Sequence, residues 1–170
     1  MNKEVAEKFS LLVDLGEITV PPSYVPDKRL GFFRRKYHRQ FFCFDKEITD
    51  ANFSNPTRIL KPGDKLHVRV FECPTPNTTS ECMKFLATEE VVYTGAQGAS
   101  LVFEQKRNQL PKGFWYTSFD EKSKLWKNVR GCYGVPYLVA LFGGSFDFIL
   151  ICFEKDVLTV KAFFCFSNTV

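Results

Sequence analysis

The most regular pattern in the chain is an alternation of apolar and polar residues along "KLHVRVFEC", residues 65–73. Leu66, Val68 and Val70 would point to one side of an extended backbone, and the residues between them to the other. The pattern therefore predicts a strand with one apolar face. Shorter apolar or aromatic runs predict further strands at 17–20, 40–48, 91–94 and 113–119.

Three apolar runs lie at the end of the chain, at 135–142, 146–153 and 157–166. Gly143-Gly144 separates the first two runs and suits a tight hairpin turn, and the polar residues "EKD" separate the second pair. This spacing predicts a three-stranded antiparallel meander. Both faces of the last two runs are apolar, so we expect helices or another sheet to cover both faces.

Apolar residues recur at helical spacing in three places. The first is 2–15 and the second is 80–88. The third begins near Gln97 or Gly98 and is stopped by Pro111, which cannot continue a helix. These segments predict two or three helices that pack against the sheet.

Together, the elements predict an α+β fold with a mainly antiparallel sheet, formed as a single domain over residues 1–170. A chain of 170 residues is long enough to bury a sizeable core. Apolar residues make up 45% of it, which excludes an intrinsically disordered protein. The 19 Phe residues imply an aromatic core, an exposed aromatic surface, or both.

Cysteine usage bears on the compartment. None of the six Cys residues forms a C-x-x-C pair, and three lie inside apolar runs, where small buried thiols are common. The segment "MNKEVAEKFSLLVDLG" is charged and lacks the apolar core of an export signal. We therefore expect a cytoplasmic protein with reduced thiols.

The run 135–153 must also be considered as a membrane span, because it holds a single charge in 19 positions. That charge, Asp147, would cost roughly 2.5–3.5 kcal/mol inside a bilayer. The Gly143-Gly144 pair in the middle of the run favours a hairpin. No transmembrane span is therefore expected.

Positive charge is concentrated in one segment, 28–44, which holds six Lys or Arg residues and no Asp or Glu. Without those six, 17 basic residues face 19 acidic ones, so the rest of the chain carries −2. Aromatic residues are interleaved with the charges. Phosphates need cations and unpaired bases need flat partners, so the segment predicts nucleic-acid binding. The predicted contact residues are Lys28, Arg29, Phe32, Phe33, Arg34, Arg35, Lys36, Tyr37 and Arg39.

Other partners suit the same segment. An acidic protein or an anionic lipid surface would also be attracted to it, and a charge run is often only a solvated surface. An exposed Phe-rich surface would instead predict a domain for protein–protein interaction or oligomerisation. Oligomeric state does not follow from the sequence.

The stretch "VVYTGAQGASLVF", from Val91, places two glycines between a predicted strand and a predicted helix. The spacing matches neither a P-loop nor a dinucleotide-binding fingerprint. Free N–H groups of Gly98, Ala99 and Ser100 at a helix start would still attract an anion, which would suit an enzyme with an anion site over Gly95–Ser100. The alternative is a tight corner in which glycine permits a positive φ.

No constellation of catalytic residues is apparent. The chain has two His residues and no G-x-S-x-G nucleophile motif. A metal site built from His67, Cys73 and Cys82 matches no established spacing. We therefore expect a non-catalytic binding module without a catalytic residue, a bound metal or a cofactor.

The run "NPTRILKPGDKLHVRVF", followed by "TSECMKFLA" and "VYTGAQGASLVFEQKRNQLPKGFWYTSFDEKSKLW", resembles a group of small uncharacterised bacterial proteins. The similarity covers roughly residues 55–126. The resemblance implies a bacterial, cytoplasmic, self-contained domain. It implies no activity, cofactor or site residue.

Overall fold

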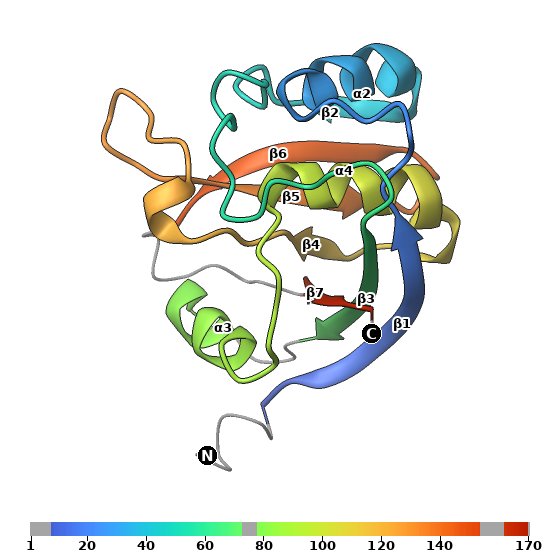
Figure 1. The fold of residues 1–170 in the computed structure, drawn as a ribbon, viewed down its shortest axis with the longest axis vertical. Coiled ribbons are helices and arrows are strands. Elements are labelled where there is room, and N and C mark those ends of the chain that lie inside the picture. Colours follow the sequence, from blue (N-terminus) through green and yellow to red (C-terminus); the bar gives the residue numbers. More distant parts are fainter. Residues whose placement is uncertain (1–7, 73–77, 154–161, 170) are drawn as a thin grey trace.

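A computed structural model describes residues 8–72, 78–153 and 162–169. In that part of the chain, three α-helices pack on a seven-stranded mixed sheet of order β1-β3-β7-β4-β5-β6-β2, which confirms the predicted α+β class (Figure 1). The strands are β1 (Ser10–Thr19), β2 (Phe41–Phe44), β3 (Lys65–Glu72), β4 (Trp115–Thr117), β5 (Gly134–Ala140), β6 (Phe146–Cys152) and β7 (Ala162–Asn168). The helices are α2 (Arg29–Tyr37), α3 (Thr79–Leu86) and α4 (Gly95–Lys106).

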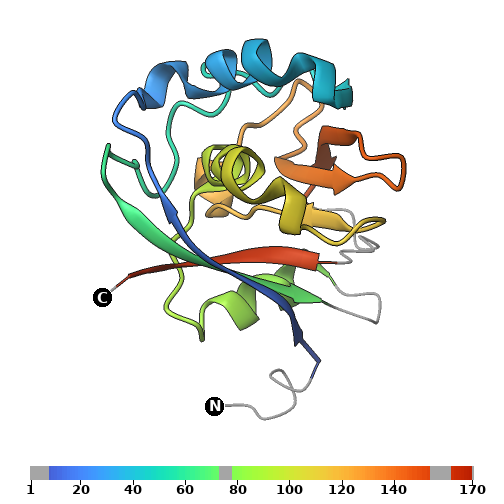
Figure 2. The ribbon, with the colours of Figure 1, turned by 90° about the vertical axis from the view of Figure 1, so that its right-hand side faces the viewer.

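Helices cover both faces of the sheet. Helix α4 lies on one face with α2 beyond it, and α3 lies on the other face (Figure 2). Strand β7 supplies both cores by alternation: Phe164 and Phe166 pack on the α4 side, and Phe163 and Cys165 on the α3 side. The expectation that both faces of this strand are covered is confirmed.

The predicted C-terminal meander is wrong in its third strand. Strands β5 and β6 form the expected antiparallel hairpin, with the turn at residues 141–145. Strand β7 instead lies between β3 and β4, antiparallel to β3 and parallel to β4. The free edge of β6 is taken by β2, in a parallel pairing from a distant part of the chain. A strand that is apolar on both faces suits this central position.

The predicted helix at 2–15 is also wrong where the structure describes it. Residues 10–15 belong to β1, which pairs with β3 along its whole length. Gly16 adopts a φ of 68° beside a register shift in that pairing. Pairing with β3 therefore overrides the local helical spacing, and residues 1–7 lie outside the described part.

Helix α4 starts at Gly95, two residues before the predicted start, and residues 91–94 are not a strand. Gly95 has a φ of 51°, so it serves as the corner residue. Gly98 has a different role. A Cβ there would collide with the Thr94 side chain and lie 2.9 Å from Cζ of Phe166. Glycine at this position lets α4 approach β7 closely.

The sulfur atoms of Cys132 and Cys152 are bonded, which corrects the expectation that the thiols are all reduced. Cys152 ends β6, and pairing of β5 with β6 brings it opposite Gly134, next to the segment that holds Cys132. The run 135–153 thus forms a hairpin that the Cys132–Cys152 bond ties to the segment just before it. Among the described residues, no helix is long and apolar enough to cross a membrane.

Candidate nucleic-acid interface

The basic segment folds as helix α2, preceded by a short 3₁₀ helix at Pro26–Lys28 and followed by another at His38–Gln40. Leu30, Phe33 and Tyr37 are buried on the inner face of α2. The outer positions recur three or four residues apart, as one face of a helix requires. They form an exposed row that we name the basic stripe: Lys28, Phe32, Arg35, Lys36 and Arg39.

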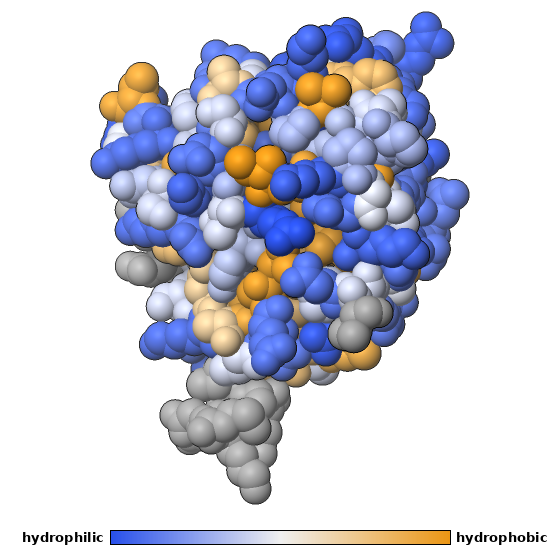
Figure 3. Space-filling view, viewed as in Figure 1, coloured by the Kyte–Doolittle hydropathy of each residue, from blue (hydrophilic) through white to orange (hydrophobic). Residues whose placement is uncertain are grey.

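The basic stripe lies on the outer surface of the molecule. Hydrophilic residues dominate the surface over α2 at the top of Figure 3. Phe32 is the exception within the row, since 47% of this large apolar side chain is exposed. The Lys36 ammonium lies 5.6 Å from the centre of the Phe32 ring. The stripe therefore combines cations with one accessible aromatic ring.

The N-terminus of α2 is closed to an external anion. Asp50 accepts hydrogen bonds from the Leu30 N–H at 2.7 Å and the Gly31 N–H at 2.9 Å. Its carboxylate satisfies two of the amides that a helix start leaves free. An anion on this face must therefore bind to side chains.

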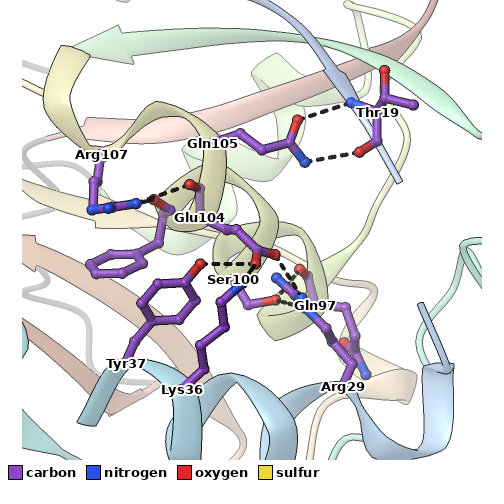
Figure 4. Close-up of polar contacts among 10 residues, drawn as sticks. Thr19, Arg29, Lys36, Tyr37, Gln97, Ser100, Glu104, Gln105 and Arg107 are labelled. Atoms are coloured by element: carbon purple, nitrogen blue, oxygen red, sulfur yellow. Dashed lines mark hydrogen bonds and ion pairs between the residues drawn. The ribbon is translucent and has the colours of Figure 1, made fainter. Parts of the chain in front are cut away.

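Arg29 is buried beneath the basic stripe, with only 4% of the residue exposed. Its Nε donates to Oγ of Ser100 at 2.7 Å, and Nη1 donates to Oε2 of Glu104 at 2.9 Å (Figure 4). Nη2 is also buried, and no described residue accepts a hydrogen bond from it. The third nitrogen of this guanidinium thus has a charge-assisted hydrogen bond to offer.

Glu104 on α4 joins α2 to the body of the protein. Its other oxygen, Oε1, accepts from Nζ of Lys36 at 2.7 Å and from the Tyr37 hydroxyl at 2.8 Å. Burial tends to raise the pKa of Glu104. The hydrogen bond from Lys36 and the charge of Arg29 outweigh burial, so the pKa lies below its usual value. The hydrogen bond to Glu104 likewise raises the pKa of Lys36.

A cavity of about 320 Å³ lies beside the stripe, between α2 and the segment that follows β1. Its walls carry four cationic side chains and one carboxylate, Glu104, a balance of +3. Tyr24 and Phe32 supply aromatic surface. We name it the Arg29 cavity, and its cations are Lys28, Arg29, Arg35 and Lys36.

The structure separates the nine predicted contact residues into three groups. Five form the exposed stripe. Arg34 is partly exposed, with its guanidinium 5.0 Å from the centre of the Phe44 ring. Arg29, Phe33 and Tyr37 are buried, so they support the helix and are not on its accessible surface. Sequence reasoning missed Glu104 because it lies 75 positions after its partner Arg29, and no local pattern links the two.

The predicted anion site at the glycine loop is wrong. The Gly98 N–H is bonded to the Thr94 carbonyl at 3.2 Å, and Ala99 and Ser100 are buried inside α4. At the actual helix start, the Asp120 carboxylate lies against Gly95. Burial raises the pKa of Asp120, although a backbone N–H of Thr57 donates to it at 3.1 Å. This position therefore already holds a carboxylate of the protein itself.

The other candidate residues are not brought together. His67 pairs with Asp14 at 2.8 Å. Cys73, the second residue of the conceivable metal site, lies outside the described residues. In the ranges that the structure covers, no group of three or more His, Cys, Asp or Glu residues is arranged to hold a metal ion.

Most of the Phe residues are inside the protein. In the described part of the chain, three Phe side chains are among the exposed large hydrophobic residues, and they lie on different elements: Phe32 on α2, Phe42 on β2, and Phe142 in the β5–β6 turn. Of these, Phe32 is the one that lies among cations. Among the three exposed Phe side chains, only the one in the basic stripe therefore combines an accessible ring with neighbouring cations.

Comparisons of the chain with protein-family models, with curated proteins and with solved structures gave no match.

Proposed function

We propose that the protein is a non-catalytic module that binds single-stranded nucleic acid through the basic stripe. The observation that carries this proposal is the exposed row of four cations, with Phe32 among them, along α2 and the short 3₁₀ helices at its two ends. Cations attract the phosphate backbone, and an accessible ring gives an unpaired base a surface on which to stack.

The dimensions of the stripe support an extended ligand. Helix α2 has nine residues and is therefore about 13 Å long, and Lys28 and Arg39 lie just beyond its two ends. This length is enough to follow a few phosphates of one strand. The stripe also has few competing anions. Of its four cations, Lys36 has a carboxylate partner at 2.7 Å, and Lys28, Arg35 and Arg39 are exposed.

The proposal is tested with a fluorescently labelled oligothymidine in anisotropy titrations from about 50 to 200 mM salt. The variant changes three stripe cations, Lys28, Arg35 and Arg39, to Ala. Each phosphate contact on a single strand contributes about −0.7 to the slope of log affinity against log salt. We therefore expect a slope shallower by about 2 and at least about tenfold weaker binding at low salt.

A matched variant controls for net charge. Lys84 on α3, with Lys127 and Arg130 before β5, gives three exposed cations away from α2. Changing these three to Ala removes the same net charge. This variant should keep the slope of log affinity against log salt that the unmodified protein shows. Equal slopes for the two triple variants would contradict the proposal.

A further inference from the structure

The Arg29 cavity has a feature that the basic stripe alone does not explain. Arg29 lines the cavity, yet its Nη2 is buried and no described residue accepts a hydrogen bond from it. A buried charged donor that lacks an acceptor is destabilising, and a ligand that supplies the acceptor would remove that cost. The guanidinium is also held rigidly by Ser100 and Glu104, so it is already oriented before a ligand binds.

The charges of the walls select an anion with more than one negative charge. Glu104 neutralises one of the four cations of the cavity, which leaves the balance at +3. The rim groups Lys28 and Arg35 are exposed and can turn toward a ligand. Exposed Arg35 can bind phosphate oxygens through two parallel hydrogen bonds, and Arg29 can add one from Nη2, which suits a phosphate monoester.

The cavity is larger than a bare phosphate would fill, and part of its wall is aromatic. A volume of about 320 Å³ lies at the lower end of the range for small-molecule sites. Tyr24 and Phe32 line the same space, so a flat ring has apolar surface to contact. Burial raises the pKa of Tyr24 to about 12, so its hydroxyl stays protonated at neutral pH.

We infer that the Arg29 cavity binds a nucleoside monophosphate, with its phosphate against Arg29, Lys28 and Arg35 and its base against Phe32. Two sources supply this chemistry: a free mononucleotide, or the phosphorylated terminal nucleotide of a strand. The terminal-nucleotide form rests on the proposed function, because the rest of the strand then follows the basic stripe. The free-nucleotide form does not.

The test is isothermal titration calorimetry of the whole chain with four kinds of ligand. These are AMP, inorganic phosphate, a ten-residue oligothymidine with hydroxyl groups at both ends, and the same strand phosphorylated at its 5′ or 3′ end. We expect AMP to bind at least about tenfold more tightly than inorganic phosphate. We also expect one of the phosphorylated strands to bind at least about tenfold more tightly than the hydroxyl strand.

Two variants assign the binding to the cavity. Arg35→Ala removes a rim cation and should weaken AMP binding about tenfold or more. Arg29→Lys keeps the charge but removes Nη2, the nitrogen without an acceptor, and should have a similar effect if it folds, as checked by thermal melting. Lys84→Ala, on α3, is the control and should bind AMP as the unmodified chain does. Loss of AMP affinity in Lys84→Ala equal to that in Arg35→Ala would overturn the inference.

The outcomes separate the two proposals. If strands bind equally well with or without a terminal phosphate and AMP does not bind, the cavity inference is overturned and the proposed function stands. If AMP binds but no strand does, the cavity inference holds for a free nucleotide and the proposed function fails. Inorganic phosphate that binds as tightly as AMP would overturn the nucleotide assignment, and binding of none of the ligands would overturn both.

Discussion

Glu104→Gln should destabilise the protein by about 3 kcal/mol, although it changes one oxygen for one nitrogen. Glu104 is the carboxylate partner of Arg29, whose side chain is 4% exposed. The amide would leave that charge buried without a counter-ion. It would also place an N–H₂ group near donors that now point at an oxygen, those of Lys36 and Tyr37.

The measurement is the free energy of unfolding from urea titrations at pH 7. Glu89→Gln is the matched control, because Glu89 pairs with Arg69 at the same 2.9 Å but with side chains 27% and 30% exposed. Solvent reaches and screens this partly exposed pair, so its contribution should be about 1 kcal/mol or less. If the two Glu→Gln changes lower the free energy of unfolding equally, the burial of Arg29 does not make its contact with Glu104 stronger, and the prediction is wrong.

The same contact gives a pH dependence. Because the pKa of Glu104 is lower in the folded protein than in the unfolded chain, its contribution to stability is present above about pH 4.5. It is lost as the pH falls from there through the folded pKa. Urea titrations between pH 7 and pH 3 should therefore show a smaller loss of stability for Glu104→Gln than for the unmodified protein.

Phe33→Ala should lower the free energy of unfolding by about 3–5 kcal/mol. The ring is fully buried, and its centre lies 5.4 Å from that of Phe103 on α4 and 6.0 Å from that of Phe148 on β6. It also contacts Phe41 at the start of β2. Removing it leaves a cavity where α2 meets both α4 and the sheet, and a packed interior closes such a cavity only in part.

The neighbouring residue is the control for Phe33. Phe32 is 47% exposed, so Phe32→Ala should change stability by about 0.5 kcal/mol or less and should weaken oligothymidine binding instead. Urea titrations and anisotropy titrations of both variants measure the two effects. A Phe32→Ala variant that loses as much stability as Phe33→Ala, or keeps full affinity, would contradict this division of roles.

Local patterns in the sequence predict the elements of the fold better than they predict its pairing. The alternation at Leu66, Val68 and Val70 identifies β3, since all three are buried on one face as expected. The Gly143-Gly144 pair likewise identifies the β5–β6 turn. The position of β7 does not follow from such signals, because it depends on which distant strand occupies the edge of β6.

The candidate site shows the same contrast between local patterns, which the sequence reveals, and contacts between distant segments, which it does not. The charge pattern identifies residues 28–44 as the segment that carries the positive excess, but the sequence did not predict that this segment folds as helix α2. The buried role of Arg29 could not be read there, because its partners Ser100 and Glu104 lie on a helix more than 70 residues away. The interpretation of Gly98 as part of an anion site was wrong for a similar reason. Its surroundings include Phe166 of β7, so contact across the fold explains the glycine and an anion does not.

The most direct test of the nucleic-acid proposal is an NMR titration of the ¹⁵N-labelled protein with oligothymidine. We predict amide shifts concentrated in residues 28–39 and at Tyr24, which lines the Arg29 cavity together with residues of the stripe. The amide signals of α3 and of residues 127–130 should not shift. Shifts centred on those two regions, or no shifts at protein and strand concentrations near 1 mM, would contradict it.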